Sequence, residues 1–381
     1  MRHPSATDRC PGVLRPHQAA DGAVLRLRMP GGHLSGSALA LLAEDLGTFA
    51  DGNLYLTSRA NVQLRGVRVD SSGSAPRALV ATIETAGLLP SGTHERVRNI
   101  VASPLTGLLG GLFDVRPVVR ELDRLLCAEE ALSGLSGRFL FTVDDGRGDL
   151  STVRADVSAR VLDRRRALVC VGDRPGGLQV HVREVAATMA RLANRFLDVR
   201  GDAWHVADLP RAGRELVEPT DLPDAGSSVV AGQPDFAMSY GILEQDDGRR
   251  ALSVLVPLGT LDPRQIQVLV DAGLRGTGDL VVTPWRGFVV PNVAAGRAND
   301  LIARLNDTGL VSDSGSPWAR ITACVGSPGC ANAWGDTRVL AHEVASQVEP
   351  EDGLPVHIVA CDRRCGTPSG PHTLLVAGAQ R

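Results

Sequence analysis

Two close pairs of cysteines near the C-terminal end carry the strongest chemical signal in this 381-residue chain. Five residues separate Cys324 from Cys330, and three separate Cys361 from Cys365. The first pair lies on a turn rich in glycine and proline, where the backbone can come close to a bulky inorganic group. The second pair follows the apolar run 357–360, which predicts a strand. Thiolates in such an arrangement can bind a metal ion or a metal cluster.

Three interpretations of these cysteines are open. Disulfides are disfavoured because residues 1–18 lack the apolar core of a secretory signal, so we expect a cytoplasmic protein. Structural zinc usually requires tighter spacings than the five-residue gap. An iron–sulfur cluster distributes four thiolate ligands over a larger body and tolerates unequal gaps. We favour the cluster, and zinc or buried free thiols are the alternatives.

A second stretch with chemical potential is 57–66, Thr-Ser-Arg-Ala-Asn-Val-Gln-Leu-Arg-Gly. Its polar residues Arg59, Asn61, Gln63 and Arg65 occupy alternate positions, so in an extended segment they share one face. Two guanidinium groups and two amides on one face suit an anionic ligand with several carboxylates. The alternative is the solvated face of an edge strand.

The elements that must position these residues occur twice. A strand at 23–29, a helix from Ser35 to Leu46 and strands at 54–57 and 62–67 are predicted from periodicity and turn residues. The same order returns at 251–290, about 226 residues later, which indicates a duplicated half rather than a solenoid.

The segments after each unit also correspond. The stretch 98–104 matches 320–324, 139–143 matches 356–360, and 167–172 matches 373–378. In this alignment Ala102 and Asp144 take the places of Cys324 and Cys361, so we expect one cluster per chain.

The cysteine spacing and the 57–66 stretch resemble those of the sirohaem-dependent nitrite and sulfite reductases and their relatives, the precorrin-3B synthases. The resemblance implies an α+β fold with two ferredoxin-like half domains, each followed by a mixed α/β lobe, around a pseudo-twofold axis. The predicted division is an N-terminal arm at 1–18, half domain 1 at 19–75, lobe 1 at 76–214, a linker at 215–232, half domain 2 at 233–297 and lobe 2 at 298–381.

The resemblance also implies site residues. A [4Fe–4S] cluster would be held by Cys324, Cys330, Cys361 and Cys365, and Cys365 would touch the sirohaem iron in a reductase. The tetrapyrrole's carboxylates would be bound by Arg59, Asn61, Gln63, Arg65, Arg98, Arg138, Arg286 and Arg320.

One difference between this chain and the reductases helps to choose between the reductases and the synthases. In the reductases the stretch matching 137–140 carries a lysine pair that binds and protonates the small oxyanion, whereas this chain has Arg138 and Leu140 and no lysine anywhere. Arginine is a poor proton donor near neutral pH, and leucine is none. This favours the synthase: an oxygen-dependent monooxygenase that hydroxylates precorrin-3A, with lactone formation, to give precorrin-3B in aerobic cobalamin biosynthesis. The alternatives are a sirohaem-dependent nitrite or sulfite reductase and a non-catalytic iron–sulfur or zinc module.

The partners implied by this resemblance are a tetrapyrrole substrate, dioxygen and an external electron donor or reductase. A non-haem iron is implied too, but the scattered histidines show no ligand motif, and no catalytic residue is assigned. A net charge of −3 and the lack of a long apolar run predict neither a nucleic-acid nor a membrane partner.

Overall fold

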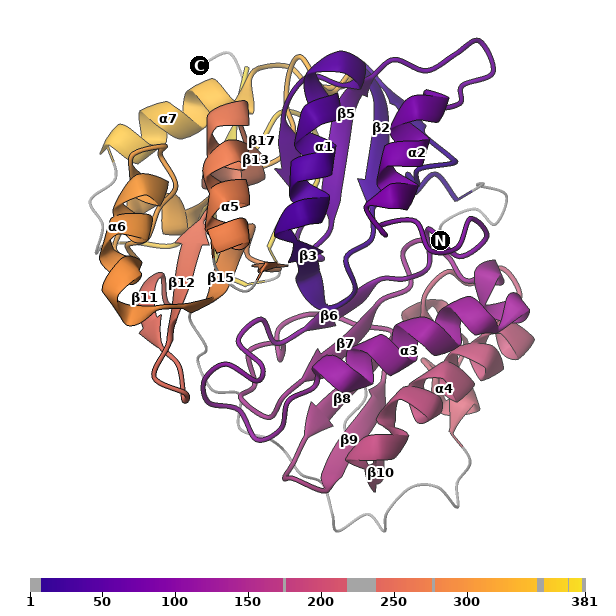
Figure 1. The fold of residues 1–381 in the computed structure, drawn as a ribbon. Helices are drawn as coiled ribbons and strands as arrows, with labels where there is room; N and C mark the ends of the chain where they lie inside the picture. Colours follow the sequence, from indigo (N-terminus) through magenta and orange to yellow (C-terminus); the bar gives the residue numbers. More distant parts are fainter. Residues whose placement is uncertain are drawn as a thin grey trace.

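The computed structural model describes residues 8–173, 176–217, 238–275, 278–347, 353–368 and 370–378. It has the predicted α+β architecture, with two similar half domains beside each other and the first lobe below them (Figure 1). Most of the predicted linker at 215–232, like residues 1–7 of the arm, lies outside the described residues. Within the described ranges, no helix has the length and apolar character needed to cross a bilayer.

Half domain 1 is an antiparallel sheet covered by helices on one face. Leu25 and Leu27 are fully buried and alternate with Arg26, as expected for a strand with one face in the core. Ser35 accepts a hydrogen bond from the Ala38 amide and so caps the first helix. The elements are β1 (His17–Ala19), β2 (Gly22–Leu27), α1 (Gly36–Phe49), β4 (Leu54–Leu56), β5 (Val62–Val67) and α2 (Arg77–Thr85).

Half domain 2 repeats this arrangement. Its elements are β11 (Gly241–Glu244), β12 (Arg250–Leu255), α5 (Pro263–Arg275), β14 (Asp279–Val282), β15 (Gly287–Val293) and α6 (Ala295–Asn306). The helices α2 and α6 pack into the same core as the two sheets, through Leu79 and Ile83 in α2 and Leu301 and Leu305 in α6. The predicted boundary at 297 therefore falls inside a helix that packs on half domain 2.

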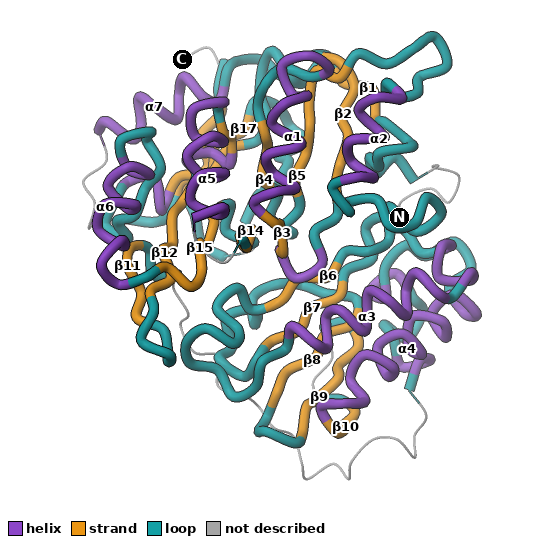
Figure 2. Tube along the Cα trace, viewed as in Figure 1, coloured by secondary structure: helices purple, strands orange, loops and turns teal. Residues whose placement is uncertain are grey.

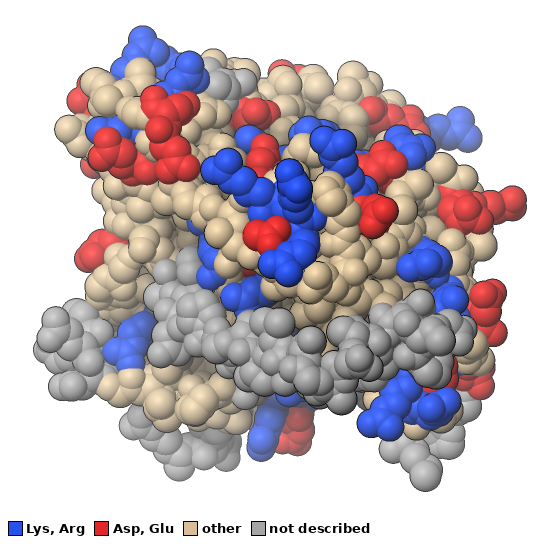
Figure 3. Space-filling view, turned by 90° about the horizontal axis from the view of Figure 1, so that it is seen from below, with Lys and Arg blue, Asp and Glu red and all other residues tan. Residues whose placement is uncertain are grey.

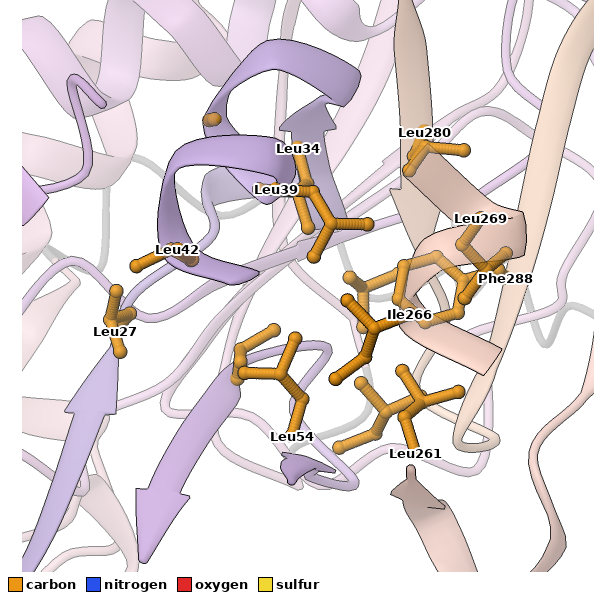
Figure 4. Close-up of a cluster of buried hydrophobic side chains, with 14 of the residues drawn as sticks. Leu27, Leu34, Leu39, Leu42, Leu54, Leu261, Ile266, Leu269, Leu280 and Phe288 are labelled. Carbon is orange, nitrogen blue, oxygen red and sulfur yellow. The ribbon is translucent and has the colours of Figure 1, made fainter. Parts of the chain in front are cut away.

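The two half domains exchange short strands. The strand β3 (His33–Ser35) pairs with β14, and the strand β13 (Thr260–Leu261) pairs with β4, so each sheet of five strands is completed by the other half. Helices α1 and α5 cross closely because Gly36 and Gly273 have no side chains: a Cβ on Gly273 would lie 3.1 Å from the Gly36 Cα. Leucines of α1 and β4 meet side chains of α5, β13 and β15 in one shared core (Figure 4). The halves are thus one folding unit.

Lobe 1 is a five-stranded mixed sheet with two helices packed side by side on one face (Figure 2). Its elements are β6 (Ile100–Ala102), α3 (Arg116–Ala128), β7 (Phe141–Asp144), β8 (Val157–Val161), β9 (Arg166–Val171), β10 (Leu178–His181) and α4 (Val185–Val199). Lobe 2 is smaller and contains β16 (Ile321–Ala323), α7 (Thr337–Gln347), β17 (Val356–Val359) and β18 (Thr373–Val376). Short 3-10 helices are η1 (Pro30–Gly32), η2 (Glu130–Gly134), η3 (Val182–Glu184), η4 (Val206–Asp208), η5 (Arg214–Leu216), η7 (Pro257–Gly259) and η8 (Pro317–Arg320).

Strand direction corrects one predicted correspondence between the lobes. The strand β18 runs parallel to β17, as β8 runs parallel to β7, whereas β9 runs antiparallel to β8. The counterpart of β18 is therefore β8, and the prediction that 167–172 matches 373–378 is wrong. Both β8 and β9 are short strands in which every second residue is buried, and such a pattern does not indicate strand direction.

Hydrogen bonds also correct which residues replace the cysteines in lobe 1. The Cys324 amide donates to the Ile358 carbonyl, and the Ser103 amide donates to the Val143 carbonyl in the same way. Ser103, rather than Ala102, therefore occupies the position of Cys324. The same register places Gly146, rather than Asp144, at the position of Cys361.

The charged surface contains both signs. On the face seen from below in Figure 3, basic side chains gather near the middle and acidic ones lie beside them. Because the chain has no lysine, all of these basic groups are arginines.

Candidate functional site

A cleft between half domain 1, half domain 2 and lobe 2 brings several of the predicted residues together. We call it the cysteine cleft; its volume is about 220 Å³. Predicted residues that line it are Gln63, Arg65, Arg286, Cys324 and Cys365. Sequence reasoning missed Arg26, Tyr55 and Arg338, which line it too.

Strand pairing places the side chains of Arg26, Gln63 and Tyr55 side by side across the sheet. In the sheet of half domain 1, Gln63 lies opposite Arg26 of β2 and opposite Tyr55 of β4. Leu25 and Leu27 point into the core, so Arg26 between them points to the other face, which is the wall of the cleft. The alternation of β2 was thus a signal that could have identified Arg26.

Arg65 forms part of the frame of the cleft. It is buried and donates two hydrogen bonds of 2.9 Å to the carboxylate of Asp21. A third bond, 2.8 Å long, goes from Nη2 to the Gly329 carbonyl in the loop between Cys324 and Cys330. Arg65 and Arg338 each also lie over the ring of Tyr55, at 5.8 and 5.7 Å from its centroid.

Arg286 presents a charge without a carboxylate partner among the described residues. It lies in a turn with a positive φ of 59°, and burial lowers the pKa of its guanidinium. A Cβ on Gly259 would lie 2.7 Å from the Arg286 Cδ, so the glycine of η7 leaves room for this side chain. A desolvated cation without an anionic partner favours the binding of an anionic ligand.

The prediction that Arg59 and Asn61 extend the same polar face is wrong. Residues 57–61 form a turn in which the Thr57 amide donates to the Asn61 carbonyl and Ala60 has a φ of 53°, so β5 begins only at Val62. Asn61 is buried: its Oδ1 accepts from the Met29 amide and its Nδ2 donates to Asn99. Asn61 therefore joins half domain 1 to lobe 1 instead of facing the cleft.

A cluster of arginines continues from the cleft toward lobe 1. Burial lowers the pKa of Arg26, and the charges of Arg59 and Arg138 lower it further. Arg59 donates a bond of 2.8 Å to the Arg138 carbonyl, and the Arg138 guanidinium lies 5.1 Å from the centroid of the Trp204 ring. The Arg26 Nε has no hydrogen-bond partner among the described residues. These three arginines make the lobe 1 side of the site positively charged.

The remaining two predicted arginines lie elsewhere. Arg98 is buried in lobe 1 and forms a two-pronged ion pair with Asp123, with bonds of 2.6 and 2.8 Å. Arg320 ends η8, just before β16. The structure therefore does not bring either residue into the lining of the cysteine cleft.

The cysteines follow neighbouring parallel strands. Cys324 comes directly after β16, and Cys361 comes two residues after β17, so the two loops leave the sheet at the same edge. Burial raises the pKa of the Cys324 thiol, and the nearby Cys365 and Cys361 raise it further. The amides of Gly326 and Ala360 donate to its sulfur and oppose this shift. Cys324, Cys361 and Cys365 therefore lie near one another, and all four thiols are unbridged.

Four thiolates on two neighbouring loops could hold a metal ion or a metal cluster. In the described ranges, no three His, Cys, Asp or Glu side chains are grouped closely enough to hold one metal ion. A cubane cluster separates its four thiolates more widely than a tetrahedral ion does. The loop also has no space for side chains at its glycines: a Cβ on Gly326 would lie 2.5 Å from the Thr337 Oγ1, and one on Gly329 would lie 2.7 Å from the Val325 Cγ1. Amides directed at a sulfur are a further property of such sites.

Comparison with known proteins agrees with this architecture. Residues 15–75 and 242–308 match the nitrite/sulfite reductase ferredoxin-like half domain, which confirms the duplication. A precorrin-3B synthase from Sinorhizobium sp. is 25% identical over 97% of this chain and 80% of its own length. The two matched segments resemble ferredoxin-like half domains of nitrite and sulfite reductases, and the whole chain is similar to a precorrin-3B synthase.

A nitrite reductase and a solved structure also match over most of the chain. A ferredoxin–nitrite reductase from Synechococcus elongatus is 25% identical over 90% of this chain and 74% of its own length. The solved structure of the NirA protein of Mycobacterium tuberculosis has the same fold, with a TM-score of 0.73 and 21% identity over 89% of this chain and 68% of that one. The similar proteins thus include a precorrin-3B synthase and a ferredoxin–nitrite reductase.

Proposed function

We propose that this protein is a tetrapyrrole monooxygenase of the precorrin-3B synthase kind, which uses dioxygen to hydroxylate precorrin-3A with formation of a lactone. The observation that carries the proposal is the burial of Leu140. Its side chain is 3% exposed and packs against Val101 and Leu150, in the stretch where the resemblance to the reductases calls for the second lysine of a proton-donating pair. The nearly full-length match to the Sinorhizobium synthase supports the same assignment.

Arg138, at the position of the first lysine in the stretch 137–140, is also a poor proton donor. Arg138 lies against the Trp204 ring, and a guanidinium keeps its proton near neutral pH. Reduction of nitrite to ammonia or of sulfite to sulfide consumes several protons at one site, whereas a hydroxylation needs only two protons to form water from the second oxygen atom. The local chemistry therefore favours oxygen insertion over multi-proton reduction.

The four cysteines would hold a [4Fe–4S] cluster, which supplies one-electron transfer when bound. Arg65 fixes the loop between Cys324 and Cys330 through the Gly329 carbonyl. A non-haem iron remains part of the hypothesis, without assigned ligands. The electrons would come from an external donor or reductase, and the protein would act in the cytoplasm.

Only one edge of the tetrapyrrole substrate would enter the cysteine cleft. The cysteine cleft has a volume of about 220 Å³, below the range typical of pockets that surround a drug-sized ligand, so it would receive only part of a macrocycle. Arg286 and Arg26 would bind peripheral carboxylates there, and the Gln63 amide would orient one of them. Arg59 and Arg138 would attract the carboxylates on the lobe 1 side.

The test has two stages. Protein purified without oxygen is first analysed for iron, sulfide and zinc and by absorption spectroscopy. It is then supplied with precorrin-3A, a chemical reductant and ¹⁸O₂. We expect about four iron and four sulfide per chain, no tightly bound sirohaem, and a lactone product carrying one ¹⁸O atom, with the second atom released as water. Cys324→Ser should lose iron and activity, while the matched control Cys127→Ser, in α3, should keep both.

Other results would identify the alternatives. Bound sirohaem with reduction of nitrite or sulfite would replace the proposal by a reductase, for which Cys365 is suitably placed because it is exposed and lines the cleft. Zinc in place of iron would point to a structural module. A cluster without turnover of precorrin-3A would also contradict the proposal.

A further inference from the structure

His357 is a buried polar residue of the lobe that carries the cysteines, and the proposed function does not yet use it. It belongs to β17 and is 0% exposed. Its Nδ1 lies 2.8 Å from the Thr322 hydroxyl of β16, and its Nε2 lies 3.1 Å from the carbonyl oxygen of Cys365. The ring therefore connects a strand of the core to the loop that carries Cys361 and Cys365.

The two bonds fix the orientation of the His357 ring. A carbonyl oxygen can only accept, so Nε2 must carry a hydrogen and donate it to Cys365. Thr322 and His357 are paired directly across β16 and β17, so the Thr322 hydroxyl holds Nδ1 from the neighbouring strand. The N–H donor of the ring is thus directed at the cysteine loop.

Lobe 1 contains the same pair of parallel strands without this polar pair. In the register established above, Val101 takes the place of Thr322. Thr142 takes the place of His357. A buried imidazole costs desolvation free energy, and its hydrogen bonds return little more than that cost. Because the lobe without the cysteines does without the histidine, the structure indicates that His357 serves the cysteine loop rather than the sheet.

The cysteine loop lies beside both the His357 ring and Arg286. Gly366 follows Cys365 and has a positive φ of 80°. A Cβ on Gly366 would lie 3.6 Å from the His357 Cε1 and 4.0 Å from the Arg286 Nη2. Glycine allows several orientations of the peptide before it. The bond from His357 therefore selects one orientation of the Cys365–Gly366 peptide.

We propose that His357 is a positioning residue of the cysteine cleft, whose Nε2–H holds the Cys365 carbonyl and so fixes the placement of the Cys365 thiol. Cys365 lines the cleft together with Cys324. Residues that support a metal ligand from behind commonly change metal affinity by about 10–100-fold when they are replaced. The inference rests on the proposed metal binding by the cysteines, but not on the monooxygenase activity.

Two substitutions separate the two bonds of His357. The amide of His357→Gln can reach the place of Nε2 and keep a donor for Cys365, whereas the shorter His357→Asn can reach only the place of Nδ1, beside Thr322. Amide hydrogen exchange of peptides covering 361–367 is measured in the purified full-length protein. We expect about fivefold faster exchange in His357→Asn and wild-type exchange in His357→Gln.

Metal retention tests the consequence for the thiols. Each purified protein is treated with a chelator, and its loss of iron or zinc is followed by metal analysis. We expect His357→Asn to lose metal about tenfold faster than the wild type, and His357→Gln to retain it. His372→Asn is the matched control: the centroid of that ring lies 6.3 Å from that of His357, but its Nδ1 bonds the Gly370 carbonyl. Thermal unfolding shows whether each variant is folded.

Unchanged exchange at 361–367 in His357→Asn would overturn the proposal. Equally fast exchange in both His357 variants would overturn it too, because it would indicate a packing role for the ring. A wild-type protein without metal would contradict the proposed function, whereas the exchange measurement would still decide the positioning role. If His357→Asn does not fold, His357→Gln decides alone: wild-type exchange supports the proposal, and faster exchange at 361–367 overturns it.

Discussion

Arg65 donates a hydrogen bond of 2.8 Å to the carbonyl of Gly329, and so connects the sheet of half domain 1 to the loop that carries Cys324 and Cys330. The same guanidinium is fixed by the carboxylate of Asp21. A residue predicted to bind ligand is thus also a support for the cysteine loop.

Replacing Arg65 by methionine should loosen this loop. The carbonyl of Gly329 loses its donor, and Asp21 loses its partner. We expect faster amide hydrogen exchange in peptides covering 325–335, by about tenfold, with unchanged exchange in lobe 1. Arg59→Met is the matched control, because Arg59 donates to the Arg138 carbonyl instead. Equal exchange in wild type and Arg65→Met would show that the loop is held by other contacts.

Gly329→Ala tests the packing of the same loop by sterics alone. The added Cβ would lie 2.7 Å from the Val325 Cγ1 and 3.0 Å from an oxygen of Asp21, so the exposed Val325 side chain or the loop must shift. We expect a loss of about 1–3 kcal/mol in the free energy of unfolding, typical of overpacking. Gly47→Ala in α1 meets nothing within 4 Å and should be neutral or slightly stabilising. Denaturant unfolding of both variants measures the difference, and equal stability would contradict the contact.

The ion pair of the buried Arg98 with the partly exposed Asp123 should stabilise lobe 1 rather than bind ligand. Arg98→Met leaves the Asp123 carboxylate without its partner, so the variant should lose about 2 kcal/mol in the free energy of unfolding. The double variant Arg98→Met with Asp123→Asn should recover part of this loss, because no charge is then left alone. Additive losses in this double-mutant cycle would show that the pair is not coupled.

The buried carboxyl of Asp149 should make the stability of the folded protein depend on pH. Its carboxyl is 3% exposed; Oδ1 accepts from the Ser103 hydroxyl, and Oδ2 has no hydrogen-bond partner among the described residues. Burial is the main cause that raises the pKa of Asp149 from 3.8 to about 7. Between these pH values the folded protein keeps a proton that the unfolded chain has released, so this group lowers stability as the pH rises toward 7.

Asp149→Asn should remove this effect. We expect its gain in unfolding free energy to be larger at pH 8 than at pH 5, by about 2 kcal/mol. Asp163→Asn is a suitable comparison, because hydrogen bonds from the neighbouring arginines lower the pKa of that exposed aspartate to about 2. A gain for Asp149→Asn that is the same at both pH values would contradict the raised pKa.

Arg286 is the residue whose loss should affect anionic ligands of the cysteine cleft most directly. It has no carboxylate partner in the described part of the chain, so Arg286→Met removes an anion contact without leaving an acid unpaired. We expect uroporphyrin, a tetrapyrrole with several carboxylates, to bind about tenfold more weakly. Arg124 is exposed and paired with Glu121, so the control variant Arg124→Met should bind uroporphyrin with unchanged affinity. Equal affinity for both variants would place the carboxylates elsewhere.

The sequence alone determined the duplicated layout and the cysteine motif. Leu25 and Leu27 alternate with polar neighbours, and the same pattern returns in the second half, because a strand with one buried face must repeat every two residues. The order of strands and helices was therefore predictable. The use of the four thiols as ligands stays a prediction. Polar alternation also predicted Gln63 and Arg65 in one wall, and both line the cleft.

Only the tertiary structure decided how each arginine is used. Asn61 and Arg59 continue the alternation in the sequence, but the turn at 57–61 redirects them. Arg98 is satisfied by Asp123, whereas Arg286 has no such partner among the described residues. Partners far apart in the chain set these differences, as do the exchanged strands β3 and β13, which no local pattern encodes. A guanidinium's role depends on which acids and carbonyls lie within hydrogen-bond distance, and that is decided by packing between segments.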